Sequence, residues 1–167
     1  MPIAAAAVKE LRELTGAGML DCKTALEQAK GDLEKAKDIL RQKGHAAAAK
    51  RAERATAQGL VHAYLHHDGR LGAIVEVNCE SDFVARTDDF RQLVQDIALQ
   101  VAATNPHYLT PEEIPDGTEG DPKELCLLLQ PFVRDESVAI QDMITEAISK
   151  TGENIRVRRF ARFELGR

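Results

Sequence analysis

The side chains best suited to metal chemistry in this sequence lie close together near its middle: His62, His66, His67 and Asp68. Imidazole and carboxylate groups are common ligands of divalent metals. On a β-strand, however, positions 62 and 66 lie about 13 Å apart at the usual rise of roughly 3.3 Å per residue. Two imidazoles at that separation need further ligands to share an ion. We therefore expect no metal site, and no other pattern indicates a cofactor.

Cys79 is the candidate nucleophile, since a nearby histidine could activate its thiol. Its spacing from Val75 and Val77 follows the two-residue period of a strand, which is typical of a small core residue. The sequence has no phosphate-binding loop and no GxGxxG or HExxH motif, and its carboxylates are scattered as on helix surfaces. An enzyme is therefore the function class that the residues favour least.

The segment Cys79–Arg86 (CESDFVAR) is the most informative part of the chain. It follows an apolar run typical of a buried strand and places Phe83 next to a carboxylate. An aromatic ring beside a charge at the end of a rigid strand could act as a charged wedge in a partner. Because apolar residues after a strand are usually buried, periodicity alone favours a core position for Phe83.

Three short helices are predicted over residues 3–43. The first has an apolar stripe and ends at a glycine-rich turn, the second ends at Gly31, and the third begins after the N-cap Asp32 and ends at Gly44. The stripe of the first helix is made by Val8, Leu11 and Leu14. An alanine-rich helical link follows. We expect a docking module of the ubiquitin-associated type over residues 1–54 and a second domain over residues 55–167.

The second domain is predicted to contain a three-stranded antiparallel sheet. Residues 60–66 and 71–79 form a hairpin around the Asp-Gly pair at positions 68 and 69. The third strand, residues 155–165, alternates: one face carries Ile155, Val157, Ala161, Phe163 and Leu165, and the other carries Arg156, Arg158, Arg162 and Glu164. Phe160 interrupts the polar face and Arg159 interrupts the apolar face. The arginines could equally be a solvated sheet face.

Helices are expected to cover one face of this sheet, which gives an α+β fold. One begins at Thr87 or Asp88 and ends before Pro106, and another follows Ser137. A short helical turn is predicted after Thr110, a solvated loop over residues 114–122, and a short apolar segment over residues 125–129.

Size and charge limit the partners of the chain. Its 167 residues, 44% hydrophobic and 29% charged, are typical of a water-soluble globular protein, and no apolar run is long enough to span a membrane. The net charge of −5 argues against general nucleic-acid binding. We also expect no signal peptide. Three unpaired, widely spaced cysteines favour a reducing cytoplasm.

Five blocks of the sequence resemble, in order, those of the bacterial elongation factor Ts family. The blocks are Thr15–Met19 (TGAGM) with Asp21–Lys23 and Ala25–Leu26, Asn78–Arg86, Gln130–Val133 (QPFV), Gly152–Ile155 (GENI), and Arg158–Phe160 with Arg162–Gly166. They span nearly the whole chain. No single block is decisive, but five in the family order are specific.

The resemblance implies a guanine-nucleotide exchange factor for the GTPase elongation factor Tu. It implies that the N-terminal module docks on the nucleotide-binding domain of the GTPase through Thr15, Gly16, Ala17, Gly18, Met19, Leu20 and Lys23. It also implies that an acidic-aromatic turn intrudes near the magnesium site and loosens the ion and the GDP phosphates; this turn is Ser81, Asp82, Phe83 and Val84.

The chain departs from the family pattern in ways that suggest a short form. Ser81 stands where threonine is usual, the segment between Ile114 and Leu125 is shorter than in many members, and the second core repeat and C-terminal module of long members are missing. Short members are thought to compensate by forming homodimers, so we expect one here. Some of them carry a cysteine where this chain has Ala161, so we expect no disulfide at that point. The alternative from another class is an adaptor whose helices bind a ubiquitin-like or ribosomal partner.

Overall fold

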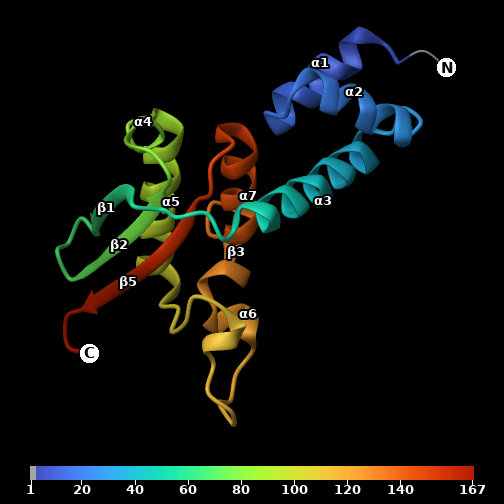
Figure 1. The fold of residues 1–167 in the computed structure, drawn as a ribbon. Helices are drawn as coiled ribbons and strands as arrows, with labels where there is room; N and C mark the ends of the chain where they lie inside the picture. Colours follow the sequence, from blue (N-terminus) through green and yellow to red (C-terminus); the bar gives the residue numbers. More distant parts are fainter. Residues whose placement is uncertain (1–2) are drawn as a thin grey trace.

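The computed structural model describes residues 3–167, and its first helices form a small unit of their own (Figure 1). These are α1 (Ala5–Thr15), α2 (Met19–Gln28) and α3 (Leu33–Arg51). The predicted cap of α3 is confirmed, because the Asp32 carboxylate accepts a hydrogen bond from the Lys35 backbone N–H at 3.1 Å. The three helices enclose one apolar cluster, consisting of Val8, Leu11, Cys22, Ala25, Leu26, Ala29 and Ala36.

Helix α3 does not end at Gly44, so this part of the prediction is wrong. The helix continues to Arg51, and most of the expected helical link is its last part. The reason lies in tertiary packing against α7 (Ile140–Thr151). A Cβ atom at position 44 would lie 3.2 Å from both Thr145 Cγ2 and Ser149 Oγ, so glycine lets the two helices approach closely.

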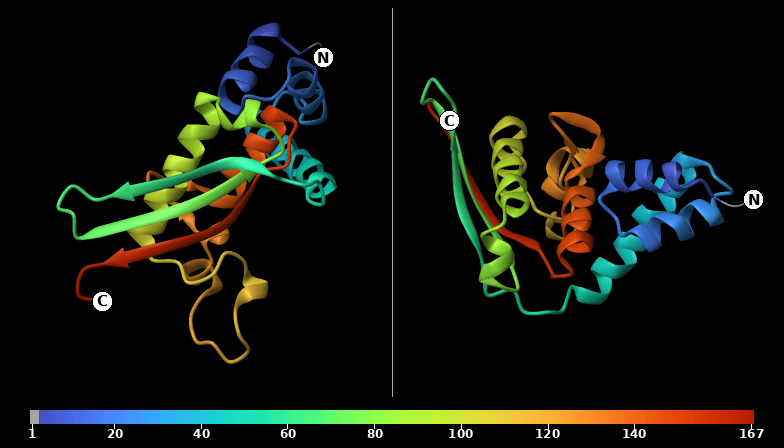
Figure 2. Two further views of the ribbon diagram at one scale, coloured as in Figure 1. Left: turned by 60° about the vertical axis from the view of Figure 1, so that its left-hand side comes forward. Right: turned by 90° about the horizontal axis from the view of Figure 1, so that it is seen from above.

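A three-stranded antiparallel sheet forms the centre of the remaining chain, as predicted. Its order is β1 (Gln58–Leu65), β2 (Leu71–Cys79) and β5 (Arg156–Glu164). In the hairpin turn, the Asp68 carboxylate accepts a hydrogen bond from the Arg70 backbone N–H at 3.1 Å. Figure 2 shows the helices on one face of the sheet, while the other face is open.

The predicted single alternation along the last strand is wrong, because β5 contains a β-bulge. Val77 pairs with Val157, but its neighbour Glu76 pairs with Arg159, so Arg158 is an extra residue. Beyond the bulge the two faces exchange: Phe160 packs on the core, and Phe163 is 69% exposed on the open face. The interruptions at positions 159 and 160 were the sign of this bulge in the sequence.

Helix α5 (Asp88–Thr104) covers the sheet directly, and α7 packs behind it and contributes to the same core. The predicted cap of α5 is confirmed by the hydrogen bond from the Phe90 backbone N–H to the Thr87 hydroxyl. The core between these helices and the sheet includes Val75, Val77, Phe90, Ile97 and Ile140, all at most 1% exposed.

Shorter elements complete the chain. They are α4 (Asp82–Ala85), the 3₁₀ turns η1 (Pro111–Glu113) and η2 (Leu127–Leu129), α6 (Pro122–Leu125), and a small hairpin of β3 (Pro131–Phe132) and β4 (Asp135–Ala139). The hairpin was not predicted, because a two-residue strand has no measurable period. Over residues 3–167, no helix has the length and apolarity needed to cross a membrane.

Candidate protein-binding site

The wedge turn, which we define as residues 79–86, presents one aromatic side chain to solvent. Phe83 is 79% exposed, although it lies next to the buried end of β2. The interpretation of Phe83 as a core residue is therefore wrong. Its neighbour Val84 takes the buried position instead and is only 6% exposed. The turn thus presents Phe83 outward because Val84 anchors it inward.

The four residues predicted as a unit occupy three different environments. Asp82 and Phe83 are exposed, and the Asp82 carboxylate pairs with Arg86 at 3.0 Å on the surface. The Ser81 hydroxyl accepts a hydrogen bond from the Val84 backbone N–H at 3.2 Å and so caps α4. In this geometry Asp82 and Phe83 are available to a partner, while Ser81 and Val84 hold the turn.

Residues outside the predicted set, from the segment that leads into β5 at the same end of the sheet, hold the wedge turn. One carboxylate oxygen of Glu153 accepts hydrogen bonds from the backbone N–H groups of Glu80 at 3.1 Å and Ser81 at 3.0 Å, and the other accepts the Ser81 hydroxyl. In return, the Glu80 carboxylate accepts the Asn154 backbone N–H at 2.6 Å. Glu153 and Asn154 were not among the predicted site residues, although both lie in the GENI block.

Cys79 is buried beneath this turn and is not poised as a nucleophile. Burial, followed by the nearby Glu153 carboxylate, raises the pKa of the Cys79 thiol to about 11. The thiol lies 3.1 Å from the Ser81 carbonyl oxygen, to which it donates a hydrogen bond. A thiol that stays protonated at neutral pH is a structural core residue, as the sequence indicated.

The predicted docking residues form the turn between α1 and α2 and the first turn of α2. Gly16 has φ 66°, and its N–H donates to the Arg12 carbonyl oxygen at 2.8 Å, which ends α1. The Thr15 hydroxyl bonds back to Leu11, and Gly18 is the N-cap of α2. The residues that follow are exposed: Met19, Leu20 and Lys23.

Large apolar side chains near this turn are exposed to solvent. Leu20 is 75% exposed and Met19 is half-exposed. Leu14, which was predicted to lie in the buried stripe of α1, is also exposed near the end of that helix. Unpartnered large apolar side chains that cluster on a surface are typical of protein-binding sites.

The structure does not bring the wedge turn and the docking residues into one patch. Helix α7 lies between α4 on one side and the first three helices on the other (Figures 1 and 2). A partner that contacts both must therefore extend across α7. A folded protein has that reach, whereas a small molecule does not.

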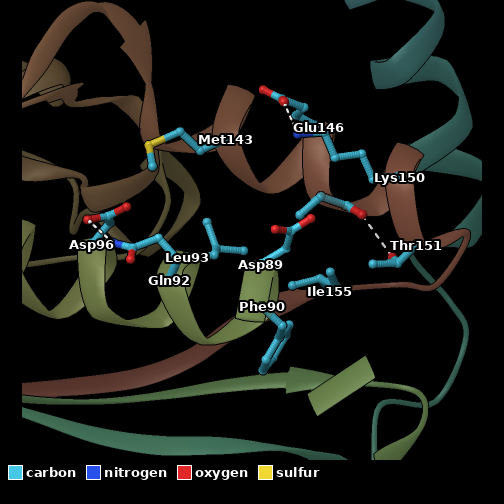
Figure 3. Close-up of a pocket in the computed structure, with 11 residues that line it drawn as sticks. Asp89, Phe90, Gln92, Leu93, Asp96, Met143, Glu146, Lys150, Thr151 and Ile155 are labelled. Atoms are coloured by element: carbon cyan, nitrogen blue, oxygen red, sulfur yellow. Dashed lines mark hydrogen bonds and ion pairs between the residues drawn. The ribbon is translucent and has the colours of Figure 1, made fainter. Parts of the chain in front are cut away.

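A shallow groove of ≈ 240 Å³ lies between α5 and α7 (Figure 3). Its floor is apolar and includes Phe90, Leu93, Met143 and Ile155. Its acidic rim is largely paired, since Glu146 forms an ion pair with Lys150 and Asp96 contacts Arg134 at 3.2 Å. These paired groups provide surface complementarity and do not form an acid–base or nucleophile set.

The histidines near the sheet hairpin do not converge on a metal site. The His66 imidazole instead lies 3.1 Å from the Tyr64 hydroxyl, within hydrogen-bonding distance. Among residues 3–167, no three histidine, cysteine or acidic side chains are grouped so that they could hold an ion.

Comparison with known proteins gives a consistent result. The family described as Elongation factor TS matches residues 5–119. Elongation factor Ts of Heliobacterium modesticaldum is 51% identical over 194 residues, covering 98% of this chain and 90% of the relative. The proteins of the same name from Carboxydothermus hydrogenoformans and Caldanaerobacter subterraneus are each 50% identical, over 95% and 98% of this chain and 87% and 97% of their own lengths. The 194 aligned residues exceed the 167 of this chain, so the first relative contains residues without a counterpart here.

Proposed function

The chain belongs to the elongation factor Ts family, and we propose that its wedge turn promotes nucleotide release by disturbing the magnesium site of elongation factor Tu. Proteins of this family are exchange factors for elongation factor Tu in translation elongation. They are not enzymes, so the chain accelerates GDP release without covalent chemistry. We further propose that it acts in the cytoplasm, where translation takes place.

The single observation that carries the proposed mechanism is the exposure of Phe83 on a turn that is otherwise anchored. An exchange factor must bind the nucleotide-free GTPase more tightly than the GDP-bound form, and by linkage GDP weakens its binding by the same factor. Phe83 provides such a difference in affinity if its ring enters a space in the GTPase that is open only when the magnesium site is distorted. Asp82 adds a negative charge where the GDP phosphates are also negative.

Phe83 alone is too small to account for exchange. Burying a phenylalanine side chain is worth about 1.5–3 kcal/mol, or one to two decades in an equilibrium constant. We propose that residues 1–54 supply the remaining affinity, with Met19, Leu20 and Lys23 in contact with the GTPase. The separate apolar cluster of α1–α3 supports a docking unit that has a core of its own.

The release rate of fluorescent GDP from elongation factor Tu tests this division of roles. We expect Leu20→Ala to raise the factor concentration needed for half-maximal stimulation, because it weakens docking. We expect Phe83→Ala to lower the maximal rate instead. The division of roles is wrong if both variants change only the half-maximal concentration.

We also propose that two copies of the chain associate through the open face of the sheet. In the paired register, Ala63 lies beside Ile74, and Ile74 lies beside Ala161. Other large side chains exposed in this region are Val61, Leu65, Phe163 and Leu165. A sheet that is apolar on both faces needs a cover on each, and a second copy offers the same apolar face by two-fold symmetry.

Sedimentation velocity tests the association directly. We expect the unmodified chain to sediment as a dimer and Phe163→Glu to sediment as a monomer with an unchanged far-UV circular dichroism spectrum, because the side chain makes no core contact. Gln130 is buried away from the open face of the sheet, so it takes no part in the proposed association. A monomeric unmodified chain at micromolar concentration would contradict the proposal. Alanine at position 161 rules out a disulfide between copies at that point.

A further inference from the structure

A four-residue helix cannot act as a rigid wedge by its own stability. Isolated helices of this length do not persist, because nucleation costs more than one turn of hydrogen bonds returns. Helix α4 therefore depends on what holds the turn in front of it. Besides the buried side chain of Val84, three hydrogen bonds from Glu80 and Ser81 to Glu153 hold this turn.

Glu153 controls the direction in which the chain leaves β2. Both of its carboxylate oxygens are occupied by donors from two consecutive residues, Glu80 and Ser81. The Ser81 hydroxyl that it accepts also caps α4 through the Val84 N–H. An unbroken series of hydrogen bonds thus runs from Glu153 into the first turn of the helix that carries Phe83, and carboxylate acceptors make such bonds strong.

The segment that follows α3, residues 52–54, also contacts the residues around Glu153. Asn154 is only 4% exposed, and its side-chain amide donates to the carbonyl oxygens of Ala52 at 3.2 Å and Arg54 at 2.9 Å. Its backbone N–H donates to Glu80, whose carboxylate also contacts Arg54 at 3.5 Å. Residues 52–54, 79–81 and 152–154 therefore meet at one polar clamp.

We infer that Glu153 is a positioning residue for nucleotide exchange: it fixes the base of the wedge turn, so that Phe83 displaces partner groups and is not itself displaced. This inference rests on the proposed role of Phe83. The binding energy of Phe83 can distort the partner only if the turn that carries the ring deforms less easily than the partner does. Small losses of preorganisation therefore have large effects on rate. Without Glu153, the turn could swing back and accommodate Phe83 without moving the GTPase.

A double-mutant cycle separates positioning from general stability. Four forms of the full chain are compared in stimulated release of fluorescent GDP: the unmodified chain, Glu153→Ala, Phe83→Ala and the double variant. We expect Glu153→Ala to reduce the maximal rate by roughly threefold or more, up to the loss caused by Phe83→Ala. In the Phe83→Ala background, Glu153→Ala should have almost no further effect, because the residue acts through the ring. If the rate loss of the double variant instead equals the product of the two single losses, the residues act independently and the inference is overturned.

Two further variants distinguish a loss of positioning from a loss of folding. Glu153→Gln keeps an oxygen for the two backbone N–H groups but loses the anionic acceptor of the Ser81 hydroxyl, so its rate should lie between those of the unmodified chain and Glu153→Ala. Glu136→Ala, at an exposed glutamate of β4, should leave the rate unchanged. An intermediate rate in Glu153→Gln with an unchanged melting temperature supports the role, and an unchanged rate in both Glu153 variants overturns it.

The two proposals fail in different ways. If Phe83→Ala leaves GDP release unchanged, the wedge itself is wrong, and the positioning role falls with it. If Phe83→Ala slows release and Glu153→Ala does not, only the positioning role is overturned.

Discussion

Replacing Phe83 with alanine removes an aromatic side chain that makes little contact within its own protein. The ring is 79% exposed, so the variant creates no cavity in the core. Substitutions at such positions change the free energy of unfolding by about 0.5 kcal/mol or less. The melting temperature should therefore stay the same, and any functional change must come from the partner interface.

The expected size of that change follows from the area available for burial. Because the side chain is almost fully exposed in the free protein, nearly all of its transfer free energy, about 1.5–3 kcal/mol, is available on binding. If this energy is gained only when the magnesium site opens, the maximal rate of GDP release should fall about tenfold to hundredfold. Binding through the docking residues should be almost unchanged.

Stopped-flow release of fluorescent GDP, with the factor in excess over elongation factor Tu, measures the maximal rate directly. Phe83→Leu is the matched variant, since it keeps an apolar side chain at the same place and should retain part of the stimulation. A normal maximal rate for Phe83→Ala would refute the reasoning. So would a tenfold loss in which Phe83→Leu is no better than Phe83→Ala, because apolar burial could then not be the source.

Two further outcomes are expected from the packing of the core. Gly44→Leu should lower the free energy of unfolding by about 1–3 kcal/mol in urea titration, because a side chain there overpacks the contact with α7; an unchanged midpoint would contradict the close approach of the two helices. The pKa of the buried Cys79 thiol is raised from 9.0 to about 11. The protonated thiol therefore makes its full contribution to the stability of the fold below pH 9, and this contribution is lost as the pH rises toward 11. Between pH 8 and pH 10, the free energy of unfolding should therefore fall by about 1 kcal/mol more in the unmodified chain than in Cys79→Ala. An equal pH dependence in the two proteins would show that the pKa of the thiol is not raised.

Local chemistry in the sequence predicted the ends of several elements well. Asp32 and Thr87 cap α3 and α5 as expected, because an N-cap is decided by residues within one turn of each other. The two strands of the hairpin were found from their period and from the Asp-Gly pair. The α+β class followed from these elements, since an apolar sheet face requires helices to cover it.

The features missed are those decided by distant parts of the chain. Gly44 continues a helix because of a neighbour about a hundred residues away, whereas glycine alone predicts an end. The exposure of Phe83 depends on which of two adjacent apolar residues is buried, and periodicity does not choose between it and Val84. Glu153 lies 72 residues from Ser81 along the chain, so nothing in its local sequence indicated the contact.

The β-bulge in β5 also determines where this protein tolerates a change in chain length. Arg158 has no partner of its own in the ladder, because Glu76 pairs with Arg159 and Val77 with Val157. Deletion of Arg158 would leave every other pair in place and convert the strand to regular alternation. Deletion of Ala161, three residues later, would move Arg162 onto the open face and Phe163 toward the helices. Length variation among related chains is therefore expected at position 158 and not in the rest of the strand.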